Sequence, residues 1–136
     1  MHFSNLDAEQ VEILEESLSA YDSRHMITQL EGRVSIGLIE NGRLLAGADA
    51  EMTAFHILYV STVFVADDCR RQGIGRQLMA ELERRALQLG ANMIRLDTFD
   101  WQGEAFYRAL GYEQVGHYEN VQDGFSEYFF VKRLSQ

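Results

Sequence analysis

The pattern of apolar and polar residues indicates a helix near the N-terminus. Val11, Leu14 and Leu18 recur at helical spacing, and the glutamates of the same segment occupy the polar side. Asp7 or Asn5 stands where the N-cap of this helix would lie, because a short polar side chain can accept from the first free amides. The sequence therefore predicts an amphipathic helix before residue 20.

After this helix the pattern predicts a second short helix and then a β-hairpin. The second helix is expected at residues 22–30, closed by Gly32. From there the apolar period becomes two, since residues 33–39 alternate and residues 44–48 return after the turn signal Glu40-Asn41-Gly42. Two antiparallel strands fit this stretch better than a helix does.

The middle of the chain reads as strand, helix and strand. Residues 55–65 are rich in β-branched and aromatic side chains, which fit a buried strand. Residues 75–89 carry apolar side chains at helical spacing, and Gly90 is placed to end that helix in a left-handed conformation. Residues 92–98 then predict a strand parallel to the first one, because a helix connects the two.

The C-terminal third predicts one more helix and a second hairpin. A helix is expected from Trp101 to Leu110, capped by Asp100 and stopped by Gly111. Two strands follow at residues 112–118 and 126–134, joined by a turn. No proline, repeat or low-complexity linker interrupts the chain, so residues 1–136 are expected to form a single domain.

Composition and charge restrict the class of protein. A chain of 136 residues with 46% hydrophobic residues can bury a core of its own, and it has no apolar run near the ~20 residues of a membrane span. The formal net charge of −9 argues against nucleic acid as a partner. The N-terminus lacks the features of a signal peptide, so a cytoplasmic location is expected. Cys69 is the single cysteine, and no Cys/His cluster has metal-ligand spacing, so neither a disulfide nor a metal site is expected.

A glycine-containing loop lies between the central strand and its helix. The sequence Arg70-Arg71-Gln72-Gly73-Ile74-Gly75 allows several backbone amides to converge where the helix dipole also favours an anion. A Walker loop would need Lys and then Ser or Thr after the last glycine, and a dinucleotide fingerprint would need glycine at position 78, which is Leu78. The loop is therefore predicted to bind a phosphate of another kind of ligand.

Two separated motifs together resemble one family. Phe64-Val65 with Arg70-x-x-Gly73-x-Gly75, and then Ala105-Phe106-Tyr107-x-x-Leu110-Gly111-Tyr112-Glu113, look like the acetyl-CoA-binding core of the GCN5-related N-acetyltransferase (GNAT) family, and closest to its small bacterial members. The resemblance spans residues 58–116. With the elements above, it implies an α+β fold, an α/β/α sandwich. Its mixed, twisted sheet would have six or seven strands and about four helices, two on each side.

The resemblance also implies a cosubstrate site. Acetyl-CoA would be bound by backbone groups of the strand end and by the loop, with Gln102 as a further polar contact. Asp100 stands where many family members have an asparagine that contacts the cofactor. Whether Asp100 makes this contact stays open. The cofactor-binding residues implied are Phe64, Val65, Arg70, Arg71, Gln72, Gly73, Ile74, Gly75, Arg76, Gln102 and Tyr107.

The implied function is acetyl transfer from acetyl-CoA to a primary amine by direct attack in a ternary complex. Tyr107, at the family's tyrosine position, would protonate or hydrogen-bond the departing thiolate, because a phenol is still protonated at neutral pH. A backbone N–H near residues 63–65 would stabilise the oxyanion. Cys69 as a nucleophile is an alternative to direct attack, which would not use this residue. A non-catalytic acyl-CoA sensor is the alternative from another class of function.

The residue that deprotonates the amine and the acceptor itself stay open. Glu51, His56, Glu127 and a water chain are the alternatives for the base. The acidic composition favours a cationic acceptor, such as a polyamine. The apolar run at residues 128–131 predicts either burial against the first helices or a homodimer through the C-terminal strands, which the family often forms.

Overall fold

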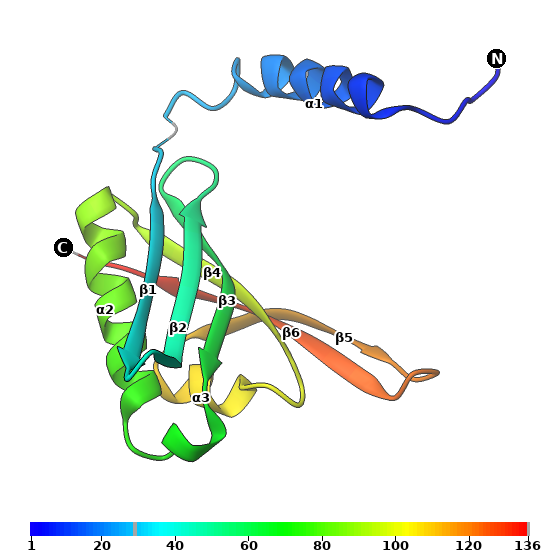
Figure 1. Cartoon of the computed structure of the whole chain (residues 1–136). Coiled ribbons are helices and arrows are strands. Elements are labelled where there is room, and N and C mark those ends of the chain that lie inside the picture. Colours follow the sequence, from blue (N-terminus) through cyan, green and yellow to red (C-terminus); the bar gives the residue numbers. More distant parts are fainter. Residues whose placement is uncertain (29, 136) are drawn as a thin grey trace.

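A computed structural model describes residues 1–28 and 30–135 (Figure 1). In this part of the chain the helices are α1 (Ala8–Asp22), α2 (Ile74–Leu89) and α3 (Glu104–Ala109), with a short 3-10 helix, η1 (Asp67–Cys69). The strands are β1 (Arg33–Glu40), β2 (Arg43–Met52), β3 (Ile57–Val65), β4 (Met93–Phe99), β5 (Glu113–Asn120) and β6 (Phe125–Arg133). None of these helices is long and apolar enough to cross a membrane.

The strands form one mixed sheet in the order β1-β2-β3-β4-β6-β5. Only β3 and β4 run parallel, since α2 carries the chain from one to the other, and the remaining neighbours are antiparallel. The α+β class and the six-stranded mixed sheet are confirmed. The first hairpin is confirmed as well, because Asn41 and Gly42 take the positive φ angles of 52° and 77° that a two-residue turn of this kind needs.

One extra residue in β3 determines where the sheet opens. Thr62 pairs with Asp49 of β2 whereas Val60 pairs with Ala50, so Ser61 is inserted as a β-bulge. The parallel pairing of β3 with β4 ends at Val60 and Leu96, at the same level. A bulge bends its strand, and beyond this point β3 stays with β2 and separates from β4.

The core lies between one face of the sheet and α2. The apolar stripe of α2 is buried on Ala46, Ala48 and Ala50 of β2, whose small side chains let the helix approach closely. The stripe consists of Leu78, Met79, Leu82 and Ala86. The helix ends at Gly90, with φ of 94°, as expected.

Helix α3 packs on the same face of the sheet as α2. The ring of Tyr107 lies 5.7 Å from that of Tyr112 and 6.1 Å from that of Phe130 in β6. Glu83 of α2 accepts from the Tyr112 hydroxyl at 3.0 Å and from Lys132 Nζ at 3.0 Å. This half-buried network fastens α2 to the last strand and to the end of α3.

Three predictions of local structure are wrong: the second helix, the start of the third strand and the start of the last helix. No helix forms at residues 23–28, where turns replace it; Gln29 lies outside the described residues. Ile27 is exposed there, so its side chain provides no packing that would stabilise a helix. The third strand begins at Ile57 rather than at Phe55, because Phe55 has a φ of +54°.

The last helix starts at Glu104 rather than near Trp101, and Asp100 does not cap it. The Asp100 carboxylate instead accepts from the Ser126 amide at 3.0 Å, which ties the segment after β4 to β6. Three helices therefore form in the described residues instead of about four, and they are not placed two on each side. Helix α1 has the predicted cap at Asp7, but it stands away from the sheet (Figure 1).

Candidate active site

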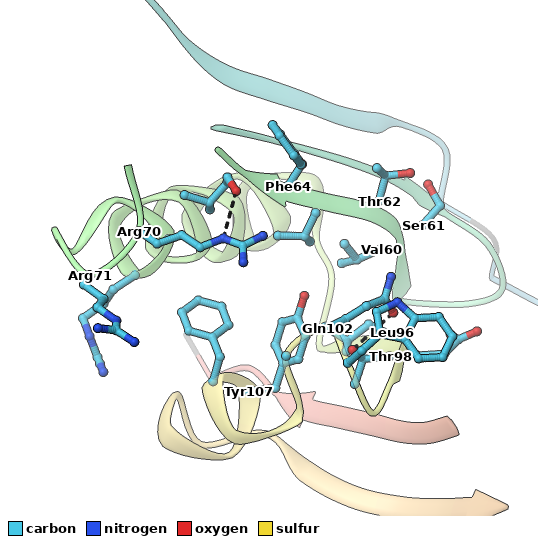
Figure 2. A pocket seen from close by; sticks show the side chains of 18 of the residues that line it. Val60, Ser61, Thr62, Phe64, Arg70, Arg71, Leu96, Thr98, Gln102 and Tyr107 are labelled. Carbon is cyan, nitrogen blue, oxygen red and sulfur yellow. Dashed lines mark hydrogen bonds between the residues drawn. The ribbon is translucent and has the colours of Figure 1, made fainter. Parts of the chain in front are cut away.

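The gap between β3 and β4 is a cavity of about 650 Å³. Figure 2 shows it between the strands above and α3 below. It is lined by Val60, Ser61, Thr62, Val63, Phe64 and Val65 of β3, by Arg70, Arg71, Gly73, Gly75 and Arg76 of the loop and α2, and by Leu96, Asp97, Thr98, Trp101, Gln102, Gly103, Phe106 and Tyr107.

The glycine loop forms the basic end of this cavity. Gly73, with φ of +78°, and Arg71, with φ of +65°, both lie in the left-handed region, which turns the backbone into the start of α2. The first amide to bond within the helix is that of Gln77, which donates to the Gly73 carbonyl at 3.0 Å. The amides of residues 74–76 therefore point out of the helix start, where an anion would be stabilised.

The two glycines have different physical roles. A Cβ on Gly73 would meet nothing within 4 Å, so the space beside it is open to a ligand. A Cβ on Gly75 would lie 3.2 Å from Cζ of Phe106. Gly75 thus allows α3 to pack against the first turn of α2, which is a structural role that the motif alone did not reveal.

Arginine side chains surround the loop. Nε of Arg70 donates to the carbonyl oxygen of Val65 at 3.2 Å, and its Nη1 lies 3.3 Å from Asp67 (Figure 2). Arg71 and Arg76 also line the cavity. Three guanidinium groups at one end of a cavity favour a phosphate-bearing ligand there.

Tyr107 lies in the middle of the cavity. Its ring is buried, and Figure 2 shows its hydroxyl pointing from α3 toward β3. Burial raises the pKa of Tyr107 to about 12. The phenol therefore keeps its proton at neutral pH and can donate it or a hydrogen bond to a group bound in the gap.

Of the side chains of Gln102 and Asp100, one lines the cavity and the other does not. Oε1 of Gln102 accepts from the Phe99 amide at 2.7 Å, which holds this side chain in the cavity wall. Asp100 is bonded to Ser126 and does not line the cavity. Of the two polar candidates, the structure brings only Gln102 to the site.

A carboxylate that the sequence reasoning missed lies at the other end of the cavity. Asp97 is the one acidic side chain among the described residues that line it. Its Oδ2 accepts from the Tyr59 hydroxyl at 3.3 Å. Burial, followed by the charges of Asp97 and Glu127, raises the pKa of Tyr59, while Glu127 accepts from the hydroxyl of Tyr118. The signal in the sequence was the position of Asp97 at the carboxyl end of a parallel strand, where ligand sites of open sheets occur.

Comparisons with known proteins agree with this geometry. Residues 3–112 match the model of the Acetyltransferase (GNAT) family. The chain belongs to this family. It is therefore an N-acetyltransferase, and the expected family, fold and enzyme class are confirmed.

Individual relatives of this acetyltransferase differ in how much of the chain they share. A crystal structure of an acetyltransferase from Bacillus cereus ATCC 14579 is 29% identical, with a TM-score of 0.91 over 98% of both chains. Blasticidin-S acetyltransferase of Streptomyces morookaense is 29% identical over 91 residues, which are 66% of this chain and 67% of that one. A streptothricin acetyltransferase from Bacillus anthracis str. Ames, crystallised with acetyl coenzyme A, shares the fold at 14% identity, with a TM-score of 0.68 over 82% of this chain and 67% of that one.

Most of the predicted cosubstrate residues of the acetyltransferase lie together. All of those named from the sequence line the cavity except Gln72 and Ile74. Gln72 donates to the carbonyl of Asp68 at 3.1 Å, and Ile74 packs against the core. These two residues can contribute backbone amides to the loop, but their side chains lie elsewhere.

The proposed bases and the lone cysteine lie outside the cavity lining. Glu51 is paired with Arg33 at 2.8 Å on β2, and His56 sits in the turn before β3. Glu127 of β6 lies on the same face of the sheet as Asp97, because it pairs with Phe99, which is two residues after Asp97 in β4. Cys69 is buried, and burial raises the pKa of its thiol, which disfavours a nucleophilic thiolate. Among the described residues no group of His, Cys, Asp or Glu side chains is placed to hold a metal ion.

Proposed function

We propose that this acetyltransferase transfers the acetyl group of acetyl-CoA directly to a primary amine of a small cationic molecule. The observation that carries this proposal is the polarity of one cavity. Its basic end has free amides and arginines, its middle has the Tyr107 hydroxyl, and its other end has the Asp97 carboxylate. A phosphate-bearing cosubstrate, a leaving thiolate and an ammonium group match these three parts in that order.

The loop supports binding of the cosubstrate's pyrophosphate. The open space beside Gly73 and the amides of residues 74–76 fit phosphate oxygens, and the helix dipole adds to the attraction. Phe64 and Val65 lie on β3 beyond its separation from β4, so their backbone groups are candidates to pair with the pantetheine arm. The arm would compete with Arg70 for the Val65 carbonyl.

The chemical step would take place beside Tyr107. The neutral amine attacks the thioester carbonyl carbon, so a C–N bond forms and the C–S bond breaks. The electron pair leaves with sulfur, and the Tyr107 hydroxyl donates a proton or a hydrogen bond to the thiolate. The proton that the attacking nitrogen loses balances the one that the thiol gains. An N–H of β3 near residues 63–65 would stabilise the oxyanion before the C–S bond breaks. The buried Cys69 has no part in this direct transfer.

The acceptor would enter from the face of the sheet that carries Tyr59 and Asp97. Two carboxylates, Asp97 and Glu127, act on the phenol of Tyr59 there, and their negative charges attract an ammonium group, while the guanidinium of Arg95 lies 4.3 Å from the centre of the Tyr59 ring. The amine must lose a proton before attack, and Asp97 is placed to receive it directly or through water. Asp97 joins the alternatives Glu51, His56, Glu127 and a water chain, and it is supported by its place in the cavity lining.

A panel of amines tests the proposed function directly. Acetyl-CoA consumption is measured with polyamines, amino sugars, lysine peptides and dicarboxylic amino acids, and calorimetry measures CoA binding separately. The expected result is turnover with a cationic amine. CoA binding without acetylation of any amine would contradict the proposal in favour of a sensor, and absence of CoA binding would contradict the cosubstrate assignment.

Asp97→Asn is expected to lower kcat/KM for the best cationic acceptor by about ten- to one-hundred-fold, because the charge that attracts and deprotonates the amine is removed. The salt dependence of kcat/KM should become weaker as well, since screening acts on that charge. CoA affinity should stay unchanged. Steady-state kinetics at two salt concentrations provide the measurement.

Glu119→Gln is the matched control for this prediction. It removes the same charge from β5, the strand beyond β6, and strand alternation places Glu119 on the face opposite to Tyr118. If both variants change kcat/KM equally, the effect comes from the net charge of the protein and not from the position of Asp97, which would contradict the prediction. A best acceptor with net negative charge would contradict the cationic assignment itself.

A further inference from the structure

Helix α1 is well specified but has no partner for its apolar face. The Asp7 carboxylate accepts from the Gln10 amide at 2.8 Å and the Gln10 side chain accepts from the Asp7 amide at 3.0 Å, which forms a complete capping box. Its apolar residues Val11, Leu14, Leu18 and Tyr21 recur along one side, and none of the residues of α1 is buried. A helix of this length is marginal in water without packing, so this stripe needs a surface.

The sheet has an uncovered apolar surface of its own. Gly47 pairs with Gly37 of β1 and with Phe64 of β3, so the three lie in one row on the face opposite to α2. A Cβ on Gly37 would lie 3.1 Å from Cδ1 of Leu44, so the Leu44 side chain lies on this face too. We call Gly37, Ile39, Leu44, Gly47 and Phe64 the open-face patch. Its three apolar side chains are between 49% and 65% exposed.

The helix cannot cover this patch of its own chain in the arrangement observed. Figure 1 shows α1 beyond the Arg33 end of β1, whereas Ile39 and Leu44 lie at the hairpin end. Arg33 and Ile39 are separated by roughly 20 Å of extended strand. Helix and patch of one molecule are therefore at opposite ends of β1.

The same arrangement is found in a crystal structure. Residues 1–28 are about a fifth of the chain. A TM-score of 0.91 over 98% of both chains leaves no room for this segment to be placed differently in the Bacillus cereus acetyltransferase. The placement of this segment is therefore shared by two chains that are 29% identical.

We propose that two copies of this protein form a dimer in which α1 of each copy packs on the open-face patch of the other. The apolar stripe of the helix then meets apolar side chains, and the glycine pair lets the helix approach the strands closely. Phe64 belongs both to the patch and to the cavity lining. The partner's α1 would therefore border the cavity on the face that carries Thr62, which Figure 2 shows pointing away from Tyr107.

The first experiment measures the mass in solution by light scattering. The parent is expected at twice the 15.6 kDa of one chain. Leu14→Glu and Leu18→Glu should each weaken dimerisation at least ten-fold. Ile13→Glu is the matched control, because Ile13 and Leu14 are both 57% exposed but Ile13 lies off the stripe, and it should remain dimeric. A monomeric parent overturns the proposal, as does a dimer that survives both stripe variants, which would point to another interface such as the C-terminal strands.

A disulfide experiment tests where the helix docks. A chain with Leu14→Cys and Leu44→Cys should form a covalent dimer on oxidation, whereas Ile13→Cys with Leu44→Cys should form at least ten-fold less, and the buried Cys69 does not interfere. A disulfide within one chain means that α1 folds back on its own sheet and overturns the proposal. Absence of the inter-chain product also overturns the docking site. Neither experiment measures acetyl transfer, so their failure is separate from a failure of the proposed function.

Discussion

Tyr107→Phe is expected to lower kcat by ten- to ten-thousand-fold with little change in CoA affinity. The substitution keeps the buried ring and its packing on Tyr112 and Phe130, and it removes only the hydroxyl that points into the cavity. A group that acts in the transition state affects turnover rather than ground-state binding. Steady-state kinetics with the best amine, together with calorimetry for CoA, separate these quantities.

Tyr112→Phe is the control for Tyr107. Tyr112 is equally buried, and its hydroxyl donates to Glu83 outside the cavity. Its loss should lower the free energy of unfolding by about 1–3 kcal/mol and leave kcat nearly unchanged. Equal turnover of the Tyr107 variant and the parent would remove this hydroxyl from the mechanism.

The raised pKa of Tyr107 gives the same proposal a second readout. Donation requires the protonated phenol, and a pKa of about 12 keeps it protonated well above pH 10. The kcat of the parent should therefore show no alkaline decline below about pH 11 from this group, whereas a phenol at its usual pKa would be half ionised near pH 10. A decline centred near pH 10 in a protein that remains folded would contradict the role of a buried Tyr107.

Gly73→Asp should abolish detectable CoA binding. The new side chain would enter the open space beside the helix start, place a negative charge where phosphate is expected, and strain a backbone held at φ of +78°. Calorimetry gives the affinity, and thermal unfolding with saturating CoA should lose the stabilisation of about 2.7 kcal/mol that the parent gains at one hundred times Kd.

Gly124→Asp is a close match for this variant. Gly124 has a φ of +75° and nothing within 4 Å of a Cβ, but it lies in the turn between β5 and β6, away from the cavity. It shares the backbone strain and the added charge, and it should bind CoA as the parent does. If Gly73→Asp binds CoA equally well, the loop is only a tight turn.

Local signals made much of the site predictable. The glycine loop, the strand before it and the helix after it lie within about 30 consecutive residues, and each carries its own pattern of apolar residues and glycines. Tyr107 could be placed in a cleft because it lies off the apolar stripe of its helix. The turn at Asn41-Gly42 was equally local.

The errors arose where distant residues determine the structure. Ser61 looks like any other strand residue, and only its pairing partner on β2 makes it a bulge. Asp100 was expected to cap a helix, but it binds Ser126, which is far along the chain. The place of Asp97 in the cavity lining depends on the separation of β3 from β4, which no stretch of sequence displays.

The bulge at Ser61 has a consequence for how the enzyme can diversify. The gap it opens depends on the number of residues in β3 and hardly on their side chains, and the loop that faces it offers backbone amides. At the opposite end the cavity is lined by the Asp97 side chain, and Tyr59 and Glu127 lie near it outside the lining. Under the proposed function, substitutions at that end would exchange one acceptor for another while the cosubstrate half is inherited unchanged.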